Sequence, residues 1–152
     1  MRFRLGSLGF ILLIGITILV GCSTHKQAME NEYSYQDLIT AFESQNLKLA
    51  SYGMTGTVLT LNKVAPQMNS IESEATVDNA DPEFVYFYIF TTEAARQTGA
   101  EEFNYKMQTA KFTTYPFLYE KGNVLIIYWA NSKGKPFFNE SIHSAINNLV
   151  KN

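Results

Sequence analysis

Strand-forming residues concentrate in three runs of the chain. The clearest, Phe84–Phe90, has seven consecutive aromatic or β-branched residues and is apolar at both odd and even positions. Such a run is typical of a central strand that is covered on both faces. The other two runs, Phe112–Tyr119 and Val124–Ala130, are joined by a short segment that contains Gly122, which predicts a hairpin. Pro116 cannot donate a hydrogen bond to a ladder, so the first strand of this hairpin is expected at a sheet edge or at a bulge.

The hairpin spacing also predicts which side chains share a face. A two-residue turn pairs odd positions of the first strand with even positions of the second. One face then carries Tyr115, Phe117, Tyr119, Val124, Ile126 and Tyr128. The other face carries Leu118, Leu125, Ile127 and Trp129.

Hydrophobic positions at helical spacing predict a first helix after Tyr33. Ser34 followed by Asp37 forms an approximate capping box, and the helix is expected to end near Asn46. Its apolar stripe consists of Tyr35, Leu38, Ile39 and Phe42.

A second predicted helix follows the central strand. Thr91 or Thr92 can cap it, Glu93 lies near its positive end, and it is expected to run to about Met107. Gly99 weakens this helix by about 1 kcal/mol relative to alanine.

Pro136 is predicted to open a last helix, in the first turn, where its missing N–H costs little. Thr57–Leu61 is predicted as a strand and Leu47–Tyr52 as a weaker one, whereas Pro66–Glu83 has no strong periodicity and is predicted to be mainly loop. Together these elements predict an α+β fold. Its mostly antiparallel sheet has about four strands, with three helices packed mainly on one face.

The chain begins with a basic and then apolar segment. Arg2 and Arg4 precede Leu5–Val20, whose 16 residues are fewer than the about 20 that span a bilayer. This length is typical of a signal peptide. The four residues that close it, Leu19-Val20-Gly21-Cys22, resemble the lipobox of bacterial lipoproteins.

The resemblance implies cleavage between Gly21 and Cys22, with lipid attached to the Cys22 thiol. The protein would then be lipid-anchored to the outer face of the bacterial cell membrane, an extracytoplasmic location. Residues 1–21 are the predicted signal peptide, residues 22–32 the lipidated N-terminus and a polar tether, and residues 33–152 a single α+β domain.

The succession of elements in the mature chain resembles small lipoproteins of Gram-positive bacteria that carry no known catalytic motif. The resemblance rests on the first helix, on F-V-Y-F-Y-I-F-T-T-E-A-A-R (84–96), and on K-G-N-V-L-I-I-Y-W-A (121–130) with the helix after it. It implies a fold and a location and no activity.

Composition narrows the classes of function. Cys22 is the only cysteine, so the mature domain has no intrachain disulfide and no cysteine metal site. Without residues 1–21 the chain keeps ten basic against fourteen acidic residues, a balance that does not suggest nucleic acid as a partner. No cofactor motif is found, and none is expected.

The two histidines are the candidate residues for acid–base catalysis. His25 lies in the tether, and His143 lies off the apolar stripe of the last helix, near Glu140. No nucleophile, zinc or phosphate-binding motif accompanies them. The acidic segment 72–83 invites a calcium site through Asp78, Asn79, Asp81 and Glu83, but it lacks the EF-hand spacing and turn glycine, so cation binding stays open.

Aromatic residues are the one compositional excess. Tyr86 and Tyr88 share a face of the central strand, and Tyr115, Tyr119 and Tyr128 share a face of the hairpin. If the two faces are continuous, they form a possible surface for a protein, peptide or glycan partner. Ordinary sheet packing is the alternative. Of Tyr86, Tyr88, Tyr115 and Tyr119, we expect Tyr86 to be the most buried and Tyr119 the most exposed.

The sequence therefore favours a membrane-anchored extracytoplasmic lipoprotein that acts as a non-catalytic binding or assembly module. Two alternatives stay open. One is a small extracytoplasmic enzyme, of the cell-wall or peptide hydrolase type, with carboxylates drawn from scattered positions. The other is an inhibitor or immunity-type protein.

Replacing Cys22 by Ala tests the anchor. The variant should accumulate as an unprocessed and unlipidated precursor, because no second cysteine can accept the lipid. Metabolic labelling with a fatty acid measures this, and a variant that keeps the label of the wild type would refute the assignment.

Overall fold

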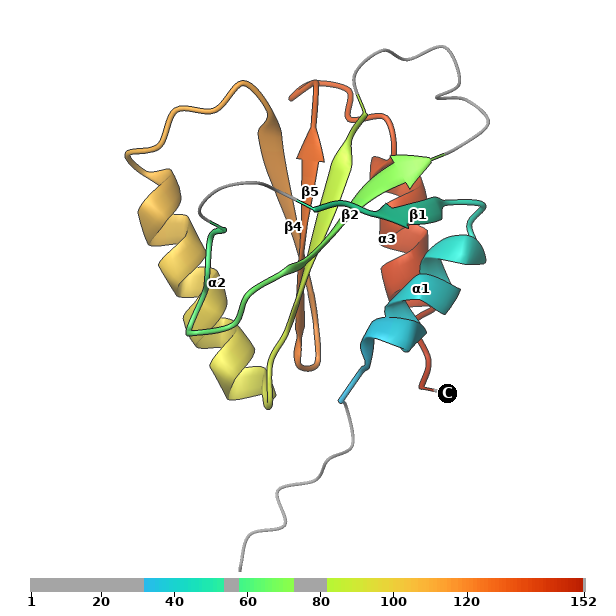
Figure 1. Ribbon diagram of the computed structural model, residues 1–152, viewed down its shortest axis with the longest axis horizontal. Helices are drawn as coiled ribbons and strands as arrows, with labels where there is room; N and C mark the ends of the chain where they lie inside the picture. The colour runs from blue at the N-terminus through green and yellow to red at the C-terminus, as the bar shows by residue number, and fades with distance from the viewer. Residues whose placement is uncertain (1–31, 54–57, 73–81, 152) are drawn as a thin grey trace, which may run out of the picture.

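The computed structural model describes residues 32–53, 58–72 and 82–151. Within these ranges, five strands form one antiparallel sheet and three helices pack against it (Figure 1). The strands are β1 (Lys48–Ser51), β2 (Gln67–Glu72), β3 (Phe84–Ile89), β4 (Tyr115–Lys121) and β5 (Val124–Ala130), in the order β1-β2-β3-β5-β4. The helices are α1 (Tyr35–Glu43), α2 (Glu93–Met107) and α3 (Asn139–Asn147). The predicted α+β class is confirmed, with one strand more than expected.

β3 is the centre of the sheet, as its sequence predicts. It pairs with β2 on one side and with β5 on the other. Phe87 and the other odd residues of β3 face a core that includes α1 and α3, whereas Tyr88 faces a core that includes α2. Both Phe87 and Tyr88 are completely buried, so β3 is covered on both faces.

The helices lie on both faces of the sheet, so the prediction of three helices mainly on one face is wrong (Figure 1). α1 and α3 cover one face, and α2 covers the other. The reason is that β3 and β5 have apolar residues at both odd and even positions, so both of their faces are apolar. All the residues of β5 are buried, and a sheet that is apolar on both sides needs a layer of helices on each.

β2 lies in the segment that was expected to be mainly loop. It pairs with both β1 and β3. The hydrophobic pattern of the sequence does not predict β2, because a polar residue, Asn69, occupies a core position and is only 1% exposed. The Asn69 side chain accepts a 2.8 Å hydrogen bond from the hydroxyl of Tyr35 on α1. This bond offsets the cost of burying the amide and allows a strand without apolar alternation.

The two expected strands before Pro66 have different outcomes. The weaker candidate, Leu47–Tyr52, is confirmed as β1. Thr57–Leu61 is wrong in its described part, because Leu61 forms only an isolated bridge with Val64. Leu61 is completely buried in the core on the α2 side, so its segment contributes packing rather than pairing.

The β4–β5 hairpin has the register that its spacing predicts. Phe117 lies opposite Tyr128, and Leu118 lies opposite Ile127. β4 is an edge strand, as Pro116 indicates. The turn between the two strands places Gly122 at a φ of 53°, in the left-handed region that favours glycine.

The helix boundaries agree with the caps read from the sequence in two of three cases. Ser34 and Asp37 form the capping box of α1, and the Thr92 side chain caps α2. α3 begins at Asn139, after Pro136, so the expectation that Pro136 opens this helix is wrong. Phe138 occupies the N-cap position, and its ring is buried in the core on the α1 and α3 face.

The two ends of the sheet differ in what they carry. At the end we call the tether end, the backbone N–H of Tyr33 donates a 2.6 Å hydrogen bond to Asn123 in the β4–β5 turn. The last described residues lie at this end too (Figure 1). At the opposite end, the far end, β3 and β4 begin and β5 terminates. No helix in the described ranges combines the length and apolar character needed to cross a membrane. The predicted signal peptide, residues 1–21, lies outside the described residues.

Gly99 in α2 provides a test of the packing on this face. A Cβ at Gly99 would lie 2.5 Å from the ring of Phe90, which is buried in the core on the α2 side. Gly99→Ala should therefore lower the free energy of unfolding by about 1–3 kcal/mol, despite alanine's better helix propensity. Gly134→Ala is the control, because its Cβ would meet nothing within 4 Å. Chemical denaturation compares the two, and a stabilised Gly99→Ala would show that α2 can move away from Phe90.

Candidate functional site

The five tyrosines named from the sequence do not form one surface. Tyr86 and Tyr88 face α2, whereas Tyr119 and Tyr128 belong to the core on the α1 and α3 face. Tyr115 lies two residues from Phe117 on that same side of β4. Because a sheet separates the two groups, the continuous tyrosine face is wrong. The exposure ranking is wrong as well: Tyr88 is completely buried and Tyr115 is 40% exposed, so these two, and not Tyr86 and Tyr119, are the extremes.

Tyr128 is the centre of a buried polar network. Its hydroxyl donates to the carboxylate of Glu83 and accepts a 3.1 Å hydrogen bond from the N–H of Phe138. Glu83, which is 5% exposed, also accepts a 2.8 Å bond from the N–H of Asn131. Burial, together with the hydrogen bond to Glu83, raises the pKa of Tyr128. The network joins the start of β3 to both ends of the connection between β5 and α3.

This network also bears on the calcium hypothesis. Glu83, one of the four candidate ligands, is directed into the core and bound to Tyr128 and Asn131. Asp78, Asn79 and Asp81 lie outside the described residues. Among residues 32–53, 58–72 and 82–151, no three His, Cys, Asp or Glu side chains are grouped so that they could hold a metal ion.

Two other tyrosine hydroxyls are bonded within the domain. The Tyr88 hydroxyl donates to the carbonyl oxygen of Leu59 at 2.8 Å, and burial raises its pKa. The Tyr119 hydroxyl donates to the side chain of Asn139 at 2.7 Å. Burial, with a smaller effect of Glu140, raises the pKa of Tyr119 to about 12. These contacts fit sheet packing rather than recognition.

A different set of aromatic residues gathers at the far end, on the face that α2 covers. We call it the far-end aromatic cluster, and it consists of Tyr52, Phe84, Tyr86, Phe112 and Trp129. Phe84 lies opposite Trp129 in the β3–β5 ladder. The ring centroids of Tyr52 and Phe84 are 4.8 Å apart, and those of Phe112 and Trp129 are 5.1 Å apart. The ring centroids of Tyr86 and Trp129 are 5.9 Å apart.

The cluster has a buried floor and exposed rings around it. Trp129 is 9% exposed, whereas Tyr52 is 43% and Phe112 is 47% exposed. Phe103 of α2 packs edge-on against Trp129, with the two ring centroids 6.1 Å apart. Exposed aromatic rings that gather in one apolar patch mark an interaction surface more often than isolated ones do.

The indole of Trp129 has an unsatisfied donor. Its Nε1 is buried and has no hydrogen-bond acceptor among the described residues. Leaving a buried donor unsatisfied costs about 1–3 kcal/mol, so such groups are rare in folded proteins. A bound molecule with an acceptor oxygen at this position would remove that cost.

The charged and ionisable groups singled out elsewhere lie away from the cluster. His143 is exposed on α3 and within 3.0 Å of the Asn147 amide. Arg96 is buried at the tether end, where its Nε donates to the carbonyl of Gly122 at 2.8 Å. It also pairs with Glu93 and Glu120. Arg96 thus holds the start of α2 to the hairpin turn, and His25 lies outside the described residues.

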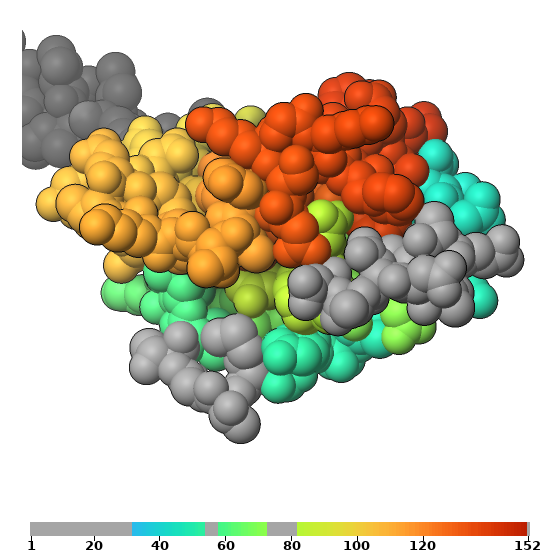
Figure 2. Space-filling view, turned by 90° about the horizontal axis from the view of Figure 1, so that it is seen from above, coloured from blue at the N-terminus to red at the C-terminus, as the bar shows by residue number. Residues whose placement is uncertain are grey.

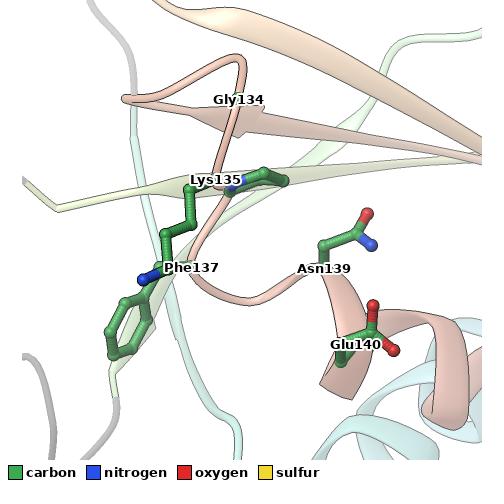
Figure 3. Close-up of a pocket in the computed structure, with 6 residues that line it drawn as sticks. Gly134, Lys135, Phe137, Asn139 and Glu140 are labelled. Carbon is green, nitrogen blue, oxygen red and sulfur yellow. The ribbon is translucent and has the colours of Figure 1, made fainter.

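An open hollow lies at the far end of the molecule, beside the start of α3. Figure 3 shows Lys135 and Phe137, from the connection after β5, on one side of it, and Asn139 and Glu140 on the other. Phe137 is 57% exposed. Asn139 already accepts the hydrogen bond from Tyr119, so the hollow offers one free charge of each sign and little enclosure.

Sequence reasoning missed the two most exposed members of the cluster. Tyr52 directly follows β1, and Phe112 precedes β4. An aromatic residue just outside a strand was the available signal, but only the tertiary structure shows that both reach the same end of the same face. No family model, curated protein or solved structure matches the chain.

Tyr128→Phe tests whether the buried network is structural. The substitution leaves the Phe138 N–H without its acceptor and removes the hydroxyl donor of the Glu83 carboxylate, which keeps the N–H of Asn131. The free energy of unfolding should therefore fall by about 2 kcal/mol. Tyr115→Phe is the control, since that ring is 40% exposed and should change stability by less than about 0.5 kcal/mol. Equal stability of the two variants in urea denaturation would contradict the role of Tyr128.

Proposed function

We propose that this chain is a membrane-anchored extracytoplasmic lipoprotein that acts as a non-catalytic binding or assembly module. We further propose that the far-end aromatic cluster is its recognition surface. The observation that carries the second proposal is the buried Nε1 of Trp129, which has no acceptor among the described residues. The leader that closes with Gly21-Cys22 supports the first.

The position of the cluster supports a role in binding. The tether joins the domain at Tyr33, which is bonded to Asn123 in the β4–β5 turn. The cluster lies at the opposite end of β3 and β5, where Phe84 pairs with Trp129. A lipid on Cys22 would therefore leave the cluster clear of the anchor and accessible to other components of the cell envelope.

The composition of the cluster suits a recognition surface. Tryptophan and tyrosine are enriched among the residues that dominate binding energy, and these residues lie near the centre of an interface. Phe112 lies in the connection between α2 and β4, outside the regular elements, so its ring can move without disturbing the sheet. Because the Phe112 and Trp129 ring centroids are 5.1 Å apart, we propose that a movement of the Phe112 ring lets an acceptor on a partner reach the Trp129 Nε1.

Alanine substitutions in the full chain test this surface. A photoreactive phenylalanine analogue at position 112 first captures the partner in intact cells, and mass spectrometry identifies it. Tyr52→Ala and Phe112→Ala should then weaken binding of that partner at least about tenfold, because interface aromatic residues are often worth about 2 kcal/mol or more.

Tyr105→Ala is the matched control. Tyr105 is 74% exposed on α2 and makes no ring contact with any described residue. Thermal unfolding of each variant verifies that the fold is kept. If Tyr52→Ala and Phe112→Ala bind the partner as well as Tyr105→Ala does, the cluster is not the recognition surface.

A further inference from the structure

The far end combines exposed aromatic rings with lysines. Lys111 precedes Phe112 in the connection between α2 and β4, and Lys133 and Lys135 lie in the connection between β5 and α3. The strand ends of the two connections are adjacent at the far end, because Tyr115 at the start of β4 pairs with Ala130 at the end of β5. Figure 2 views the molecule from this end and shows the orange and red-orange segments side by side.

These three lysines are not neutralised within the described part of the chain. Lys111, Lys133 and Lys135 are exposed, and none of them forms an ion pair with a described residue. By contrast, Lys106 pairs with Glu102 at 3.2 Å. The chain as a whole is acidic, with a net charge of −2, so an unpaired basic group beside the recognition surface is a local departure from the overall charge.

We propose that the far end binds an acidic polypeptide segment that also carries apolar side chains. This inference rests on the proposed function and names the chemistry of its partner. Carboxylates of the partner would approach Lys111, Lys133 and Lys135, and its apolar side chains would pack on the rings of Phe112 and Phe137. An acceptor oxygen of its backbone would satisfy the Nε1 of Trp129.

Two other occupants fit the observations less well. A phosphate polymer would pair with the lysines, but it offers no apolar groups for rings that are 47% and 57% exposed at Phe112 and Phe137. An anionic membrane surface attracts both lysine and aromatic side chains. However, the tether leaves the domain at Tyr33, at the opposite end. The polypeptide is the occupant that uses the charges, the rings and the position together.

Trp129 supplies the measurement, because it is the only tryptophan in the chain and forms the floor of the cluster. The full chain is reconstituted in phosphatidylcholine vesicles, which carry no net charge. Its fluorescence is followed during titration with three soluble peptides that lack tryptophan. The first contains Glu, Phe and Ser, the second has Lys in place of Glu, and the third has Ser in place of Phe.

The first peptide should shift the Trp129 emission in a saturable way and should bind at least about tenfold more tightly than the other two. Raising the salt concentration should weaken the binding of this peptide, because salt screens the attraction between exposed charges. The triple variant Lys111→Asn, Lys133→Asn, Lys135→Asn should bind it at least about tenfold more weakly, since charge pairs at an interface contribute to affinity as well as to specificity. Lys63→Asn should change binding less than about twofold, because Lys63 is exposed in a different connection, between β1 and β2.

Each failure has a separate meaning. If the Glu and Lys peptides bind equally, or if the triple variant binds as the wild type does, the acidic partner is refuted while the aromatic surface stands. If phosphatidylglycerol vesicles shift the Trp129 emission and the Glu–Phe peptide does not, the occupant is a membrane and the polypeptide is refuted. If, in addition, Phe112→Ala binds the cellular partner as tightly as the wild type does, the proposed recognition surface is refuted together with the acidic partner.

Discussion

The pairing of β3 with β5 is the constraint on which the rest of the structure depends. The two strands are joined over six residue pairs, from Phe84–Trp129 to Ile89–Val124. Because both strands are apolar at odd and even positions, neither face of the pair can remain in water. The sheet must therefore be covered twice, by α1 and α3 on one face and by α2 on the other. The positions of all three helices follow from this requirement.

Buried polar groups then fix the connections to that sheet. Glu83 and Tyr128 hold the segments at the far end, and Arg96 and Asn123 do the same at the tether end. In these networks donors meet acceptors, and the buried Nη1 of Arg96, which has no hydrogen bond, is paired with the Glu120 carboxylate instead, so burial costs little. The Nε1 of Trp129 differs from them, since no described residue accepts from it. This contrast, within one domain, is why we assign recognition to the far-end aromatic cluster and structure to the other polar groups.

Local patterns predicted the elements that carry a strong periodic or capping signal. These include β3, the β4–β5 hairpin with its register, the capping box of α1, and α2 to its last residue. The failures occurred where tertiary contacts replace a local signal. β2 is polar and is stabilised by a buried asparagine, and α3 starts late because Phe138 is first directed into the core. A sequence pattern that assumes apolar burial cannot detect either case.

The sequence by itself determined the class of the fold, the central strand and the hairpin register, because each depends on residues close together in the chain. Only the tertiary structure decided which faces the helices cover and which aromatic residues meet. Tyr86 and Tyr128 proved to lie on opposite sides of the sheet, whereas Tyr52 and Phe112, far apart in sequence, lie at one end of one face. Side-chain alternation along a strand is local, but the order of strands and the layer on each face are set by the burial of the whole chain.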